Sequence, residues 1–129
     1  MADLVVLAED DESLGQLIKL KLEKAEIQVI WKKNGNDALS AIRSQKPALA
    51  LLDVDMPGIN GLDLLKRIKL ARDTQHIPVI MISALGYEAY TGDALRQGAS
   101  DFIVKPFQPA DMLVRVQRAI EQAHIPPAK

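Results

Sequence analysis

The sequence has no cysteine and few aromatic residues. Its 129 residues include two phenylalanines, two tyrosines, one tryptophan and two histidines. The absence of cysteine excludes disulfide bonds, thiolate metal ligands and a cysteine nucleophile. The two histidines, His76 and His124, lie far apart in the chain, so we do not expect a zinc site, although a single catalytic histidine stays open.

The chain also lacks a charge bias and a long apolar segment. With 16 basic and 17 acidic residues its formal net charge is −1, which favours neither nucleic acid nor an anionic membrane as a partner. No stretch reaches transmembrane length, and no basic segment with a long apolar run opens the chain. We therefore expect a cytoplasmic protein without direct nucleic-acid or membrane contact. Its 48% hydrophobic content suits one folded domain.

Five short apolar runs predict β-strands, and five segments with helical spacing of apolar residues alternate with them. The strands are expected at residues 4–8, 27–31, 48–52, 79–82 and 102–104. The helices are expected at 13–25, around 38–42, 62–68, 87–97 and 109–123. Asp11 is expected to cap the first helix, and Pro109 to lie in the first turn of the last.

This alternation predicts an α/β domain with a doubly wound parallel sheet covered by helices on both faces. Residues 34–36 (Asn-Gly-Asn) are expected to form a turn, and Leu17 to lie on the apolar stripe of the first helix. The only tryptophan, Trp31, is expected to be structural. The domain should span residues 1–123, followed by a tail or the start of a linker at 124–129.

The segment from residue 48 to 62 is the most informative. Its apolar strand is followed by Asp53, where the strand should surface, and then by a loop rich in proline and glycine. A carboxylate at the carboxyl end of a central parallel strand is where such sheets place their chemistry. An aspartate can also simply end a strand and begin a turn. Both interpretations of Asp53 are open from this segment alone.

Polar side chains follow four of the five predicted strands. Glu9 and Asp10 follow the first strand, Asp53 the third, Ser83 the fourth and Lys105 the fifth. Because parallel strands end at the same edge of a sheet, these residues should meet in one crevice.

Three close carboxylates repel one another unless cations join them. Lys105 offsets one charge, and oxygen ligands with room for water suit Mg²⁺. A metal ion beside a carboxylate and a lysine is suited to phosphoryl transfer, and aspartate can attack phosphorus to give an aspartyl phosphate. Asp53 is therefore the candidate nucleophile.

These residues resemble those of response-regulator receiver domains of two-component signalling, including the chemotaxis receivers. The resemblance covers nearly the whole chain, in the family's order and spacing. It rests on Glu9-Asp10, on Asp53 followed by Met56-Pro57 and Gly61, on Ser83-Ala84, and on Lys105-Pro106-Phe107. The fold that it implies is flavodoxin-like, a (βα)5 domain with strand order 2-1-3-4-5.

The resemblance implies a role for each residue of the site. Asp53 would accept a phosphoryl group from a sensor histidine kinase or a histidine phosphotransfer protein. Mg²⁺ would be bound by Asp10, by Asp53, by the backbone carbonyl of Asp55, and by Glu9 through water. The phosphoryl group would be bound by Lys105, Ser83 and Ala84, with a cis peptide bond before Pro106.

The resemblance also implies a conformational switch. Ser83 would move to the phosphoryl group and Phe102 would turn inward, shifting an output face made of helix 4, strand 5 and helix 5. Asp101 and Arg115 match a pair that one branch of the family uses across a dimer, although uncharged residues stand at 91, 97 and 122. We expect a monomer or a phosphorylation-dependent dimer that acts on a downstream protein or on an effector domain missing from this chain.

Two other functions are considered. Asp53-Val54-Asp55 is a D-x-D motif, as in haloacid-dehalogenase-like phosphatases, but there the motif lies on the first strand. A receiver-like binding module that no longer accepts phosphate is the second alternative.

The receiver interpretation implies a regulatory domain rather than an enzyme, one that catalyses only its own phosphorylation and slow dephosphorylation. The sequence assigns no role to the Asp55 side chain.

Overall fold

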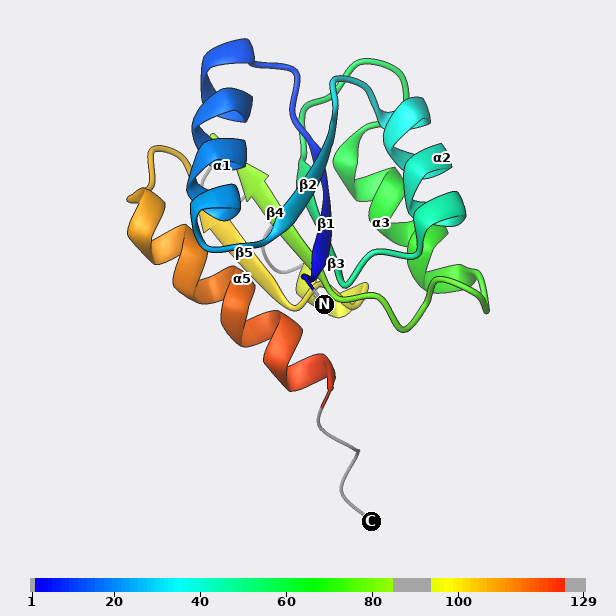
Figure 1. Cartoon of the computed structure of the whole chain (residues 1–129). Coiled ribbons are helices and arrows are strands. Elements are labelled where there is room, and N and C mark those ends of the chain that lie inside the picture. Colours follow the sequence, from blue (N-terminus) through cyan, green and yellow to red (C-terminus); the bar gives the residue numbers. More distant parts are fainter. Residues whose placement is uncertain (1, 85–93, 125–129) are drawn as a thin grey trace.

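A five-stranded parallel sheet lies between two layers of helices (Figure 1). The computed structural model describes residues 2–84 and 94–124. Its strands are β1 (Leu4–Ala8), β2 (Gln28–Lys32), β3 (Leu49–Asp53), β4 (Val79–Ser83) and β5 (Asp101–Val104). Its helices with defined bounds are α1 (Glu12–Lys24), α2 (Gly35–Gln45), α3 (Gly61–Leu70) and α5 (Pro109–Ala123). The strand order β2-β1-β3-β4-β5 confirms the predicted doubly wound, flavodoxin-like fold.

The expected helix at residues 87–97 falls mainly outside the described residues. Residues 94–96 are helical, and Ala94 is fully buried. No described helix is both long and apolar enough to cross a membrane.

The strands are uninterrupted apolar runs because both faces of the sheet are covered. Successive side chains of a strand point to opposite faces. In β1, Val5 and Leu7 pack in the cluster that includes residues of α1 and α5, whereas Val6 and Ala8 pack in the cluster with α2 and α3. All four side chains are fully buried.

Side-chain caps fix where the helices begin. The Asp11 carboxylate accepts a hydrogen bond from the backbone N–H of Leu14, which confirms the predicted cap of α1. Pro109 lies in the first turn of α5, also as predicted. The predicted turn at residues 34–36 is wrong beyond Asn34: the Asn34 side chain caps α2, so the next two residues are already helical.

The position of Leu17 differs from the prediction. The buried residues of α1 are Gly15, Ile18 and Leu22, which share one face at helical spacing. Leu17 lies off this face and is 45% exposed. The apolar stripe of α1 is thus wider than the face that the sheet covers.

Candidate functional site

The acidic residues meet at the carboxyl edge of the sheet, as the parallel topology requires. β1 and β3 are neighbours, with Ala8 opposite Leu52, so the residues that follow these two positions lie side by side. Asp53 is the last residue of β3, and its side chain is 4% exposed. The expectation that the strand surfaces at Asp53 is therefore wrong: Lys105 Nζ lies 3.2 Å from one carboxylate oxygen, and Asp55 N of the following loop lies 3.4 Å from the other.

One lysine joins two of the carboxylates. Lys105 Nζ lies 3.1 Å from Glu9 Oε1 and 3.2 Å from Asp53 Oδ2. Carboxylate oxygens of Glu9, Asp10 and Asp53 lie within 4.8 Å of one another. Glu9 is fully buried, whereas Asp10 is exposed. The cluster thus has a closed side at Glu9 and an open side at Asp10.

This environment shifts two pKa values. Burial raises the pKa of Glu9 to about 7; the Asp53 charge adds to this, while the backbone N–H of Asp11 and the Lys105 ammonium oppose it. Burial by itself lowers the pKa of Lys105, but interaction with Glu9 and Asp53 outweighs burial and raises it. The site therefore favours a charged lysine beside a carboxyl group that titrates near neutral pH.

The donor set fits a hard divalent cation such as Mg²⁺. All three clustered acids offer oxygen ligands, the type that Mg²⁺ prefers. Glu9 Oε1 is buried and accepts no well-oriented hydrogen bond from the described residues, although the Lys105 ammonium is near. A buried oxygen in this state can accept a further partner, such as a water molecule bound to a cation.

The loop after Asp53 is held tightly against the sheet. Val54 N donates to Ile82 O and Gly61 N donates to Val54 O, each at 2.8 Å. Asp55 N lies 3.4 Å from Asp53 Oδ1, and the Asp55 side chain is exposed. A Cβ atom at Gly61 would lie 2.2 Å from Asp53 O, so only glycine allows this approach. The sequence predicted Gly61 in the loop, whereas it is the first residue of α3, and its contact with Asp53 was not predicted.

The other expected site residues lie on β4, on β5 and just after these strands. Ser83 is fully buried, and its backbone oxygen accepts a 2.8 Å hydrogen bond from Lys105 N. The peptide bond between Lys105 and Pro106 is cis. Ala84 is exposed. Phe102 is 8% exposed and belongs to the core cluster on the α2 and α3 side, so its ring is already buried in this structure.

Asp101 and Arg115 pair with each other within one chain. Arg115 Nη1 donates to both carboxylate oxygens of Asp101, at 2.8 and 2.9 Å, and Arg115 Nε donates to Asp111 at 2.9 Å. These bonds join β5 to α5 and involve none of the clustered acids.

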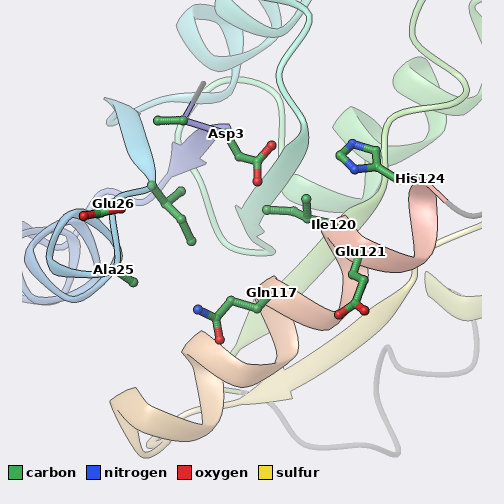
Figure 2. A pocket seen from close by; sticks show the side chains of 9 residues that line it. Asp3, Ala25, Glu26, Gln117, Ile120, Glu121 and His124 are labelled. Atoms are coloured by element: carbon green, nitrogen blue, oxygen red, sulfur yellow. The ribbon is translucent and has the colours of Figure 1, made fainter.

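Two pockets lie at opposite ends of the sheet. One, of about 580 Å³, borders the cluster through Lys105 and Ala84, and its apolar walls include Leu14, Leu17 and Phe107. The other, of about 540 Å³, lies where β1 and β2 begin and is also lined by α5 (Figure 2). None of the expected site residues lines this second pocket.

One contact of the site was not anticipated. The indole Nε1 of Trp31 donates a 2.8 Å hydrogen bond to the backbone oxygen of Glu9. Nothing in the residue spacing indicates this contact, which depends on the register that places Ala8 opposite Lys32.

The doubly wound sheet with its acidic carboxyl edge places the protein among the flavodoxin-like α/β domains. Within that class the chain belongs to the response-regulator receiver domain family of two-component systems, since the sequence model of this domain matches residues 5–117. Receiver domains are regulatory rather than catalytic, and phosphorylation and Mg²⁺ binding are typical of the family.

Curated relatives agree with this assignment. The chain is 31% identical over 123 residues to the phosphate regulon transcriptional regulatory protein PhoB of Rhizobium meliloti (strain 1021), covering 95% of this chain and 54% of PhoB. It is 29% identical over 129 residues to the DNA-binding response regulator MtrA of Mycolicibacterium smegmatis, covering 100% and 55%. The chain spans about half the length of these relatives.

Solved structures agree as well. A putative response regulator from Chloroflexus aurantiacus J-10-fl superposes with a TM-score of 0.89 at 28% identity, covering 94% of this chain and 99% of that one. The BeF3-activated N-terminal receiver domain of Klebsiella pneumoniae RstA gives 0.84 at 31% identity, covering 93% and 100%.

Proposed function

We propose that this chain is a phosphorylation-activated signalling switch and that Asp53 is its phosphoacceptor. The observation that carries the proposal is the position of the Asp53 carboxylate, which ends the central strand β3 and lies 3.2 Å from the Lys105 ammonium within the acidic cluster. The phosphodonor is a phosphohistidine of a sensor kinase or of a phosphotransfer protein. The family match argues against the phosphatase alternative, whose D-x-D would lie on the first strand rather than on β3.

In the transfer step an Asp53 carboxylate oxygen forms a bond to phosphorus. The bond between phosphorus and the donor imidazole nitrogen breaks, and its electron pair stays on that nitrogen. Lys105 stabilises the charge on the phosphoryl oxygens, and Ser83 and Ala84 bind them. Attack of water on the aspartyl phosphate returns the carboxylate and releases inorganic phosphate. The chain thus catalyses only its own phosphorylation and slow dephosphorylation.

Mg²⁺ is the proposed cofactor. Asp10, Asp53 and the backbone carbonyl of Asp55 would bind it directly, and Glu9 would bind it through water. When bound, the ion neutralises charge on the transferred phosphoryl group. The oxygen donors of the cluster and the buried Glu9 Oε1 support this assignment.

We propose that the phosphodonor domain docks at the pocket beside Lys105. It is open to solvent next to the cluster, and the exposed Leu17 of α1 gives it an apolar wall. An exposed apolar surface beside a reactive group is typical of a docking site for another protein. We expect this encounter to occur in the cytoplasm.

Phosphorylation would be transmitted through Ser83 and Phe102 to the face of α5, β5 and the helix before it. Phe102 packs in the core cluster on the α2 and α3 side, which supports a role for its ring in coupling the site to this face. The target is a downstream protein or an effector domain outside this chain, with residues 1–123 as the receiver and 124–129 as a tail or linker. Asp101 and Arg115 lie on this face. The chain would act as a monomer or would form a phosphorylation-dependent dimer through this face.

The test is phosphorylation by acetyl phosphate with Mg²⁺. We expect one phosphoryl group per chain, stable in acid and labile in base, and no labelling of Asp53→Asn, which should keep the fold.

Sustained hydrolysis of many equivalents of a phosphomonoester would favour the phosphatase. Labelling of the variant at another residue would contradict the assignment to Asp53. If beryllofluoride with Mg²⁺ left the NMR signals around Ser83 and Phe102 unchanged, the non-phosphorylated binding module would be the better description.

A further inference from the structure

Trp31 contacts the segment that carries two of the three clustered acids. It lies on β2, next to β1 in the sheet, and its indole Nε1 donates a 2.8 Å hydrogen bond to Glu9 O. Glu9 N donates at 3.0 Å to Lys32 O, the next residue of β2. Both backbone polar groups of Glu9 are therefore bonded to β2, one of them through a side chain.

The bonded carbonyl belongs to the peptide group that joins Glu9 to Asp10. A planar peptide turns as a unit, so fixing its oxygen also fixes the direction of the Asp10 N–H. The orientation of this peptide sets where both acidic side chains start. On the far side of Glu9, Asp11 N donates to Glu9 Oε2 at 3.1 Å. The Trp31 bond thus acts on the backbone between two acids, while the Asp11 bond acts on one carboxylate.

The indole is held in place by α1. A Cβ atom at Gly15 would lie 2.0 Å from Trp31 Cζ2 and 2.8 Å from Cη2, so the glycine makes room for the six-membered part of the ring. Phenylalanine at position 31 would lack those atoms. Gly15 and Trp31 therefore fit as a pair.

A basic residue also contacts the ring. Lys33 Nζ lies 5.5 Å from the centre of the Trp31 ring, within the range of a cation–π contact, and it also pairs with Glu12 at the start of α1. The indole thus contacts both α1 and a cation, and its N–H donates to Glu9 O.

We propose that Trp31 is a positioning residue of the Mg²⁺ site, which holds the Glu9–Asp10 peptide in the orientation that cation binding requires. The inference rests on the proposed function, because it concerns the same acidic cluster. Partners that orient the ligands of a metal typically change its affinity about tenfold or more when they are removed. Trp31 acts here through the peptide rather than through either carboxylate.

The experiment replaces one atom group of the indole. Incorporation of β-(3-benzothienyl)alanine at position 31 keeps the ring shape and removes the N–H, whereas 5-fluorotryptophan keeps the N–H and is the matched control. Mg²⁺ affinity is measured by calorimetry on each folded, metal-free protein. We expect about tenfold weaker binding for the benzothienyl protein and unchanged binding for the fluorinated one. The single indole N–H signal of the wild type should be protected from exchange and should shift on Mg²⁺ addition.

A second set of variants tests the packing independently. Gly15→Ala should displace the indole and weaken Mg²⁺ binding, but it should add little in a Trp31→Phe background, where the new methyl group has room. Equal Mg²⁺ affinity of the benzothienyl and wild-type proteins would overturn the role of Trp31 and leave the proposed function intact. Failure of the wild type itself to bind Mg²⁺ would overturn both.

Discussion

At the scale of single residues, Glu9 lies in an environment that disfavours the charge of its carboxylate. Its side chain is fully buried beside Asp53, and one lysine serves both acids. Burial of like charges costs free energy unless each charge has a partner. Glu9 therefore remains protonated up to near-neutral pH in the metal-free protein, with its pKa raised to about 7. The negative charge of Glu9 is therefore most stable when a cation is bound to the cluster.

This environment predicts how the stability of the metal-free protein depends on pH. Between the unfolded pKa of 4.5 and the folded value of about 7, the folded state binds more protons than the unfolded state. The contribution of Glu9 is therefore fully present below pH 4.5 and is lost as pH rises through 7. We expect the free energy of unfolding to fall by about 2 to 3 kcal/mol over this range from Glu9 alone. Urea denaturation in EDTA at several pH values measures it.

Glu9→Gln is the matched control, because glutamine can keep the hydrogen bond from Asp11 N without a charge. Effects of the other titrating groups cancel in the difference between the two proteins. The variant should match the wild type near pH 5 and exceed its stability at pH 8. Parallel curves for the two proteins across this range would show that Glu9 titrates normally.

At the scale of elements, α1 presents two exposed leucines with different surroundings. Leu17 is 45% exposed and lines the pocket beside Lys105, whereas Leu20 is 48% exposed and does not line it. The two residues therefore separate an effect on docking from a general effect of a new charge on α1.

We expect Leu17→Glu to slow phosphotransfer from a phosphohistidine domain about tenfold or more, since charge in an apolar contact costs at least about 1.4 kcal/mol. Leu20→Glu should transfer at nearly the wild-type rate. Acetyl phosphate, which needs no protein contact, should phosphorylate both variants equally. Rapid-quench measurement of the three proteins with each donor gives the comparison. An equal loss in both variants, or a loss with acetyl phosphate, would remove the pocket from the docking surface.

The strands could be predicted from the sequence because both faces of the sheet are covered. The apolar runs of β1 and β3 identified strands without any knowledge of their partners, and the end of each strand located the acids. The predictions were wrong where tertiary packing determines which side chains are exposed. Asp53 is covered rather than surfaced, and Leu17 is exposed because the sheet covers only part of the apolar stripe of α1. Trp31 was expected to be structural; it packs against the core cluster on the α1 and α5 side, but its bond to Glu9 depends on strand register, which the sequence does not display.

At the scale of the whole molecule, the site exists only when the sheet is assembled. Its acids follow β1 and end β3, and its lysine follows β5, the edge strand at the far side of β4. These segments are distant in the chain and have no reason to meet in the unfolded state. A cation bound by the cluster therefore binds the folded state alone, and its binding free energy adds to the stability of the entire domain.

Mg²⁺ should accordingly raise the unfolding temperature of the domain, and one exposed acid should control the effect. At a Mg²⁺ concentration 100 times the dissociation constant, the gain is about 2.7 kcal/mol, which corresponds to roughly 10 °C for a chain of this size. Asp10→Asn should make the metal-free protein slightly more stable, because it removes one of three close like charges, and only slightly because Asp10 is exposed. It should lose most of the Mg²⁺-dependent shift, because it removes one ligand charge from the cluster. Differential scanning calorimetry with and without Mg²⁺, at constant ionic strength, measures both proteins. If Asp10→Asn kept the full Mg²⁺-dependent rise in unfolding temperature, the stabilising ion would bind at another site. Nonspecific screening of surface charge cannot account for a difference between the two proteins, because it affects both alike.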